Sequence, residues 1–294
     1  MPRVSAARYG KDNVRVCKVD KDPATGIHTV TEMTVCCLLE GDIETSYTEA
    51  DNSVVVATDS MKNTIYIKAK EHPVNPPELY ASYLGTHFLD KYPHIHVANI
   101  KIVTHRWTRM TIDGKPHTHS FWRDGQNTRD VEARISRKDG ISLVSGISGL
   151  SVFKSTGSAF YGFVRDEFTT LGETHDRILS TDIDATWSWK FPDTKAVEEA
   201  APKFNKAFED ATAICMKTFA EDESASVQNT MYKMSEQILD AAPEVQTVTF
   251  ALPNKHYFEI DLSWHKGYKN TGKDAEVYAP QSNPNGLIKV EVSR

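Results

Sequence analysis

The chain of 294 residues lacks the features that mark several large functional classes. No run of about 18 apolar residues, the length that a membrane-spanning helix needs, occurs in it. Residues 1–16 contain no apolar segment long enough for a secretory signal, so we expect none. The formal charge is −6 and basic residues are scattered, whereas a sequence-independent grip on nucleic acid needs a basic face. We therefore expect neither a membrane nor a nucleic-acid partner.

Cysteine is scarce, and several common catalytic motifs are missing. There is no GxxxxGK[ST] phosphate loop, GxGxxG fingerprint, GxSxG elbow or HExxH pair. The four cysteines show no spacing typical of a metal or redox site: Cys17, Cys36, Cys37 and Cys215. Adjacent thiols within an apolar run usually behave as small buried hydrophobes, which favours a reducing compartment.

The chain contains a mixture of strand-like and helix-like patterns. Two prolines, Pro76 and Pro77, predict the start of a helix, and apolar stripes with helical spacing follow over residues 204–219 and 227–238. Strand-like runs rich in β-branched residues cover residues 15–22, 31–47, 53–60, 63–70 and 96–112. The pattern predicts an α+β fold with antiparallel hairpins and helices on one face.

A weak internal repeat suggests that one structural unit is used twice. Thr58-Asp59 precedes a strand-like stretch that ends in lysines, and Thr181-Asp182 precedes a similar stretch that ends at Lys190. Because the order of the elements also recurs, we predict two units, residues 1–137 and 138–294.

The stretch from Leu150 to Arg177 carries the most specific chemistry. Arg177 presents a planar fork of donors, and Phe160 supplies a flat stacking face. Together these two groups could hold a small, planar, anionic molecule. On burial habits alone, a core phenylalanine and a solvated arginine are the commoner interpretation.

Three further residues are candidates for proton transfer. Lys11 becomes a base only when burial or a nearby cation lowers its pKa, and a solvated charge is the simpler interpretation. The hydroxyl of Thr58 could relay a proton or cap a turn. His256 could move protons near neutral pH, or could serve as an ordinary hydrogen-bonded histidine at the start of a strand.

A predicted helix start adds a candidate anion site. If Ser224 is the N-cap, Val227 falls in the first turn, where backbone N–H groups have no helical partner. Gln228 next to it offers a carboxamide that both donates and accepts. An exposed helix residue is the alternative interpretation of Gln228.

A metal site must also be considered, because histidines cluster in the first half of the chain. His-x-His spacing on a strand places both rings on one face, which suits zinc or copper, although no carboxylate or cysteine lies at a ligand-like interval. The histidines concerned are His94, His96, His105, His117 and His119.

Several of these segments together resemble one family. Residues 150–177 closely resemble the signature of urate oxidases (uricases), from Lys154-Ser155-Thr156 through Phe160 and Leu171 to Arg177. Phe153 departs from the smaller aliphatic residue usual in the family, which we interpret as a packing change. Three more patterns of the family stand intact: Tyr9-Gly10-Lys11, Thr58-Asp59-Ser60 and Asn254-Lys255-His256-Tyr257.

The resemblance implies a cofactor-free oxidation of urate by dioxygen and water to 5-hydroxyisourate and hydrogen peroxide. It implies a proton relay through Lys11, Thr58 and His256. It further implies substrate binding by Thr58, Asp59, Phe160, Leu171, Arg177, Val227, Gln228 and Asn254. Urate, dioxygen and water would be the partners, and no metal or organic cofactor would be needed.

The same resemblance implies an assembly and a location. Urate oxidases carry two tandem tunnelling-fold units per chain, whose sheets join into a barrel within a homotetramer, with active sites at the subunit interfaces. Thr58 and Asp59 would reach the site from the neighbouring subunit. The family suggests the peroxisome, but the C-terminal Val292-Ser293-Arg294 is not a tripeptide of the Ser-Lys-Leu type, so the cytoplasm or a trimmed chain is the alternative.

Two rival functions stay open. A tunnelling-fold enzyme acting on pterins is one, although the zinc-type arrangement of cysteine and histidine expected of a cyclohydrolase is missing. A purine-binding or storage module that has lost its chemistry is the other, and intact Lys11, Thr58 and His256 argue against it.

Overall fold

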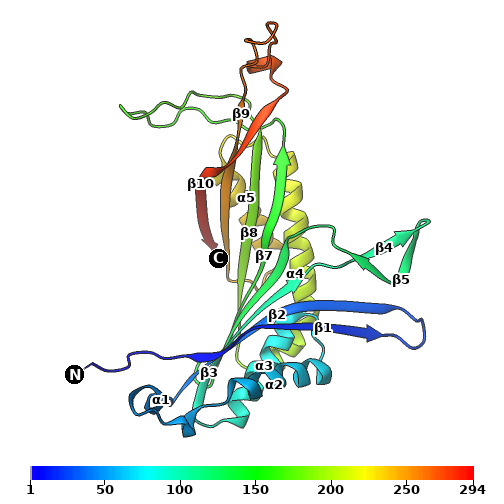
Figure 1. Cartoon of the computed structure of the whole chain (residues 1–294), viewed down its shortest axis with the longest axis vertical. Helices are drawn as coiled ribbons and strands as arrows, with labels where there is room; N and C mark the ends of the chain where they lie inside the picture. The colour runs from blue at the N-terminus through cyan, green and yellow to red at the C-terminus, as the bar shows by residue number, and fades with distance from the viewer. Residues whose placement is uncertain (1) are drawn as a thin grey trace. The chain divides into compact units, whose positions relative to one another are not determined.

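The computed structural model describes residues 2–294, with the backbone alone at residue 282. The chain divides into two compact units that are interleaved along the sequence (Figure 1). Unit 1 contains the chain up to Ser148 together with Thr186–Glu209 and Glu244–Gln246, and unit 2 contains Gly149–Ala185, Asp210–Pro243 and Thr247–Arg294. The tandem division between residues 137 and 138 stays a prediction.

Unit 1 is built on antiparallel strands that follow the order β1-β2-β3-β6-β7. Buried residues alternate along β2, as they do when one face of a sheet packs on a core: Met33, Val35, Cys37 and Leu39. The strands are β1 (Tyr9–Lys21), β2 (His28–Gly41), β3 (Ile95–His105), β6 (Thr128–Ser136) and β7 (Gly140–Lys154), whose last residues belong to unit 2. The strands β4 (Thr108–Ile112) and β5 (Lys115–Trp122) form a separate hairpin.

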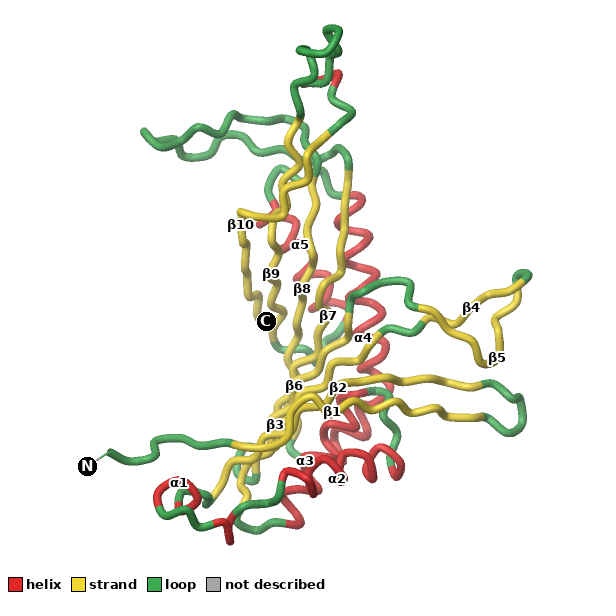
Figure 2. Tube along the Cα trace, in the orientation of Figure 1, coloured by secondary structure: helices red, strands yellow, loops and turns green. Residues whose placement is uncertain are grey.

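Helices cover the core face of the unit 1 sheet (Figure 2). Helix α2 (Thr58–Glu71) packs on β1, and α3 (Pro77–Lys91) packs on β3 and β6. Proline at the first position of α3 confirms the predicted helix start, because its fixed φ suits the first turn. Two short elements connect β2 to α2: α1 (Thr45–Thr48) and η1 (Asn52–Val54).

Unit 2 has the strand order β7-β8-β9-β10, with helix α5 packed on β9 and β10. Its apolar stripe of Val227, Met231, Met234 and Ile238 is buried, which confirms the helix predicted there. The elements not yet given are β8 (Leu179–Phe191), α4 (Thr194–Glu221), α5 (Val227–Ala241), β9 (Thr247–Glu259), η2 (Gly272–Asp274) and β10 (Tyr278–Ser293). Both β8 and α4 contribute residues to both units.

The α+β class with antiparallel pairing is confirmed, but two predicted strands are wrong. Residues 63–70 lie within helix α2, and residues 53–60 contain η1 and the start of that helix. The buried residues of α2 are Met61, Ile65 and Ala69, whose spacing of four belongs to a helix. The β-branched residues around them concealed this longer period, because they favour strands.

The predicted Thr-Asp repeat is also wrong as a structural repeat. Thr58-Asp59 opens a helix, whereas Thr181-Asp182 lies inside strand β8.

Helix α4 begins at Thr194, well before the predicted apolar stripe over residues 204–219, and Pro202 lies inside it. Within residues 2–294, none of the helices combines the length and apolarity that crossing a membrane requires.

Candidate active site

The backbone around Lys11 has two special features that aim its side chain. A Cβ at Gly10 would lie 1.8 Å from the carbonyl oxygen of Cys37, so only glycine lets β1 approach β2 this closely. After Lys11 the register between the strands shifts, and Asn13 adopts a φ of 56°. A β-bulge of this kind turns a side chain away from the regular alternation. Lys11 is half-buried beside this bulge.

A hydrogen bond ties the Lys11 strand to the start of α2. The backbone N–H of Val56 donates to the hydroxyl of Tyr9 at 2.6 Å, two residues before Thr58. Burial raises the pKa of Tyr9, and the hydrogen bond from Val56 only partly opposes it, so the phenol stays protonated. Tyr9 belongs to the Tyr9-Gly10-Lys11 pattern, which by itself assigns it no role. It holds the segment before Thr58 against the strand that carries Lys11.

Thr58 and Asp59 form the first turn of α2. The preceding residue, Ala57, provides no side-chain cap, so the first amides of this turn have no partner within the helix. The carboxylate of Asp59 accepts from Lys62 at 2.7 Å, and this contact lowers its pKa, with a smaller contribution from the charge of Lys11. Lys11, Thr58 and Asp59 therefore belong to two elements of unit 1 that pack on each other, β1 and α2.

In unit 2, Phe160 and Arg177 lie next to each other, as a pair that binds a flat anion would. The backbone N–H of Arg177 donates to the carbonyl of Ser158 at 2.8 Å, and Phe160 exchanges two backbone hydrogen bonds with Thr174 at 2.8 and 2.9 Å. These contacts place the Arg177 guanidinium carbon 5.2 Å from the centre of the Phe160 ring. Phe163 stacks on that ring with centroids 4.7 Å apart.

The guanidinium of Arg177 has a buried donor that is available to a negative group. Its Nε is buried without an acceptor among the described residues, and burial lowers the pKa of Arg177. Buried donors in folded proteins almost always have a partner, so an unpaired one requires an explanation. An anion held by the planar fork would supply the missing acceptor.

The helix start next to the clamp differs in detail from the prediction. The N-cap of α5 is Ser226, whose hydroxyl accepts from the N–H of Asn229 at 3.1 Å, and not Ser224. Val227 therefore occupies the first helical position, where its N–H has no partner within the helix. Its side chain is 7% exposed, while Gln228 is exposed.

Ser224 has a different role, because it joins this segment to the clamp. Its N–H donates to the carbonyl of Gly157 at 3.0 Å, and its carbonyl accepts from the N–H of Ala159 at 2.8 Å. The backbone that carries Phe160 and the helix start that carries Val227 thus belong to one small ladder within unit 2. This contact depends on pairing between residues far apart in the sequence. The residue type at position 224 therefore could not have predicted it.

Strand β9 carries the remaining predicted residues of unit 2. Asn254 and His256 share one side of the strand, because side chains alternate along it. Lys255 lies on the opposite side and donates to Asp182 at 2.6 Å. The ring of His256 stacks on Phe258 with centroids 5.9 Å apart. Leu171 is 54% exposed, and its carbonyl accepts from Arg165 at 2.7 Å.

The histidine cluster does not form a metal site in the part of the chain that the structure describes. Among those residues no group of three His, Cys, Asp or Glu side chains is arranged to hold a metal ion. His94 contacts the carbonyl of Val54 at 3.0 Å, and His96 contacts Asp42 at 2.9 Å. The metal interpretation therefore lacks a ligand set within residues 2–294.

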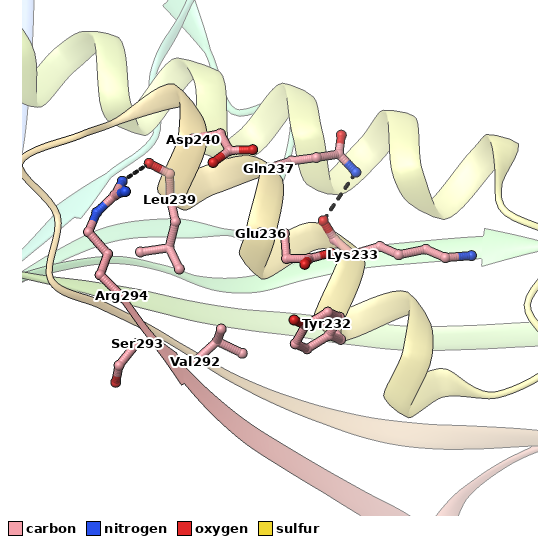
Figure 3. A pocket seen from close by; sticks show the side chains of 9 residues that line it. All are labelled: Tyr232, Lys233, Glu236, Gln237, Leu239, Asp240, Val292, Ser293 and Arg294. Atoms are coloured by element: carbon pink, nitrogen blue, oxygen red, sulfur yellow. Dashed lines mark hydrogen bonds between the residues drawn. The ribbon is translucent and has the colours of Figure 1, made fainter.

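A polar pocket of about 520 Å³ lies elsewhere in unit 2, between α5 and the end of β10 (Figure 3). It contains none of the predicted site residues. At its edge the guanidinium of Arg294 donates to the carbonyl oxygens of Leu239 and Ala242, near the end of α5. A cation is favourable there because the last carbonyls of a helix are unpaired. The contact holds β10 on the helix.

An α+β fold with a guanidinium whose buried Nε is unpaired among the described residues, set against an aromatic ring, is suited to binding a small, flat anion. Comparison with known proteins is more specific. A family profile described as uricase matches residues 7–134 and 143–289. Over 295 residues the chain is 66% identical to the uricase of Emericella nidulans and 65% identical to that of Aspergillus flavus, covering 100% of this chain and 98% of each relative.

A solved structure agrees. The crystal structure of the uricase from Arthrobacter globiformis matches with a TM-score of 0.88 at 34% identity, covering 100% of this chain and 96% of that chain. This chain belongs to the uricase family. The resemblance inferred from the sequence patterns is thereby confirmed.

Proposed function

We propose that this chain oxidises urate with dioxygen and water to 5-hydroxyisourate and hydrogen peroxide. The observation that carries the proposal is the buried, unpaired Nε of Arg177, whose guanidinium lies against the Phe160 ring in a chain of the uricase family. A urate anion is flat and has acceptors along its edge. It therefore satisfies both the fork of donors and the stacking face.

The family resemblance, together with this arrangement, supports the binding roles. Arg177 holds the anion, and Gln228 pairs with the purine edge through its carboxamide. The N–H of Val227 at the start of α5, which has no partner within the helix, adds a donor, because helix N-termini favour negative groups. Phe160 stacks on the ring, and Leu171 packs beside it.

The proton relay uses Lys11, Thr58 and His256. Removal of a second proton from bound urate produces an electron-rich dianion, which can pass two electrons to dioxygen one at a time. Water guided by Thr58, His256 and Asn254 then adds to the oxidised ring. The reduced dioxygen takes up the two protons that urate has lost and leaves as hydrogen peroxide. The dianion is itself the reductant, so we expect the reaction to need neither a flavin nor a metal.

We propose that the active sites form between the subunits of a homotetramer. The outer edges of β1 and β10 have no neighbouring strand among the described residues, and unpaired edges favour joining to another chain. Two apolar side chains of the segment after Phe160, Val164 and Phe168, are 93% and 82% exposed, which a second copy would cover. The charge of Lys11 lowers the pKa of Asp59, and β1 packs on α2 within unit 1. We therefore expect the subunit that supplies Thr58 and Asp59 to supply Lys11 as well.

Dilution tests this assembly. Activity per chain should fall as a diluted sample dissociates, and a fully active monomer would contradict the interface site.

A peroxisomal location is proposed from the family resemblance alone. Imaging of the native chain in its own cells tests it, and a cytoplasmic signal would contradict it.

One assay tests the reaction against both rival functions. Purified protein is mixed with urate in the presence of a strong chelator, and urate absorbance and hydrogen peroxide are followed together. We expect loss of urate with release of peroxide. Binding of purines without turnover would favour the storage module, and turnover of a pterin in place of urate would favour the other enzyme. Elemental analysis of the active sample checks for a stoichiometric metal.

A further inference from the structure

A short segment, residues 222–226, connects α4 to α5 and contains a partly buried acidic side chain. The side chain of Asp222 is 11% exposed and accepts two hydrogen bonds from α5. The Nζ of Lys233 donates to one carboxylate oxygen at 2.6 Å, and the hydroxyl of Thr230 donates to the other at 2.6 Å. Lys233 and Arg294 both line the pocket between α5 and the end of β10, and in Figure 3 the Lys233 side chain points away from Arg294. Asp222 therefore fixes the first turns of α5 to the connecting segment.

The backbone of Asp222 is held from the other side. The Nζ of Lys154 donates to its carbonyl oxygen at 2.6 Å and lies 5.5 Å from the centre of the Phe219 ring. Lys154 is the last residue of β7, directly before the stretch that carries Phe160. One residue thus links the end of β7 to the start of α5.

The charges at this point are mutually compensated. Burial alone would raise the pKa of Asp222, but hydrogen bonds from Lys233 and Thr230 and the charges of Lys233 and Lys154 hold it below the usual range. Burial lowers the pKa of Lys154, and the charge of Asp222 opposes that shift. A partly buried carboxylate with two donors favours one geometry, because displacement weakens two charge-assisted hydrogen bonds at once.

This node, the contacts of Asp222 with Lys154, Lys233 and Thr230, is linked through Ser224 to both halves of the proposed urate clamp. Two residues after Asp222, Ser224 pairs with Gly157 and Ala159, and its hydroxyl lies 2.9 Å from that of Thr230. The same small ladder continues through Ser158 to Arg177. A shift of α5 against residues 157–160 would therefore change the gap between Arg177 and the α5 start.

We propose that Asp222, held by Lys154 and Lys233, is a positioning residue that sets the distance between the Arg177 guanidinium and the start of α5, and thereby the affinity for urate. The inference rests on the proposed function. Asp222 acts through the groups that it holds and does not touch the substrate. Small displacements in such a clamp have large effects on binding and rate.

The test uses substitutions that keep the shape and remove the charge. Asp222→Asn should raise the KM for urate and the Kd for xanthine, used as an unreactive flat purine, by about tenfold, and should lower kcat by less than about threefold. Lys233→Met should act in the same direction. The double variant should be no worse than about twice the stronger single variant, because both changes disrupt one contact.

A matched control separates positioning from general stability. Lys217 on α4 forms an exposed ion pair with Glu221 at 4.0 Å. Glu221 directly precedes Asp222, so Lys217→Met removes a lysine from a salt bridge close to Asp222 without touching Asp222 itself. We expect wild-type KM and kcat for this variant. Lys154→Met provides a second way to loosen the node and should again raise KM more than it lowers kcat.

Two outcomes would overturn the inference. One is a lower melting temperature of Asp222→Asn with unchanged KM and xanthine Kd, which would make the residue a stabilising group only. The other is a loss confined to kcat. If Asp222→Asn does not fold, the same criteria apply to Lys154→Met and Lys233→Met. Failure of the wild-type chain to consume urate would instead contradict the proposed function.

Discussion

Replacement of Arg177 by alanine is the most direct test of the urate clamp. The guanidinium offers a charged fork to the substrate, and hydrogen bonds to charged groups contribute about 1.5–3 kcal/mol. Since about 1.4 kcal/mol corresponds to a factor of ten, KM should rise by roughly ten- to a hundredfold. Arg177→Lys should recover only part of this loss, because an ammonium keeps the charge without the planar fork.

The effect of the same substitution on stability is expected to be small. The Nε of Arg177 has no acceptor among the described residues, so its removal leaves no buried protein acceptor without its donor. The contact of its guanidinium with Phe160 would be lost, which amounts to about 0.5–1 kcal/mol. Replacement of Arg177 also removes a buried donor that has no partner within residues 2–294, and this gain in stability offsets part of that loss. The melting temperature should therefore stay close to that of the wild type.

Steady-state kinetics and direct binding of xanthine by calorimetry measure both effects. Arg106→Ala serves as the control, because Arg106 pairs with Asp124 at 2.6 Å in unit 1 and takes no part in the proposed clamp. A KM and a xanthine Kd within about twofold of the wild type for Arg177→Ala would refute the reasoning, since a charged contact cannot contribute so little. A large loss of stability would show that the guanidinium has a structural partner instead.

Further substitutions test the relay, the backbone and the core. Lys11→Met should keep xanthine binding and lower kcat on the order of a hundredfold or more, and near wild-type turnover would exclude the relay. Gly10→Ala should destabilise the fold by more than about 1–3 kcal/mol in urea unfolding, because its Cβ would overlap the β2 backbone; Gly172→Ala, with open space around it, is the control, and equal midpoints would contradict the close approach. Glu78→Gln should cost about 3–5 kcal/mol, because it leaves the buried Arg129, 2.8 Å away, without its charged partner; a cost below about 1 kcal/mol would argue against a buried pair.

Local patterns in the sequence were sufficient for features that depend on short range. Proline at the first position of α3 and the apolar stripe of α5 are read from neighbouring residues, because capping and helical periodicity act within a few turns. The same reasoning failed over residues 58–71, where β-branched residues favoured a strand and tertiary packing of Met61, Ile65 and Ala69 favoured a helix.

The candidate site divides in the same way. The sequence by itself identified Phe160 and Arg177 as a pair suited to a flat anion, since their chemistry depends on residue type. Only the tertiary structure decided that Arg177 has an unpaired donor, that Tyr9 holds the segment before Thr58, and that Asp222 joins β7 to α5. Such contacts join residues far apart in the chain, and no periodicity records which distant segments will meet.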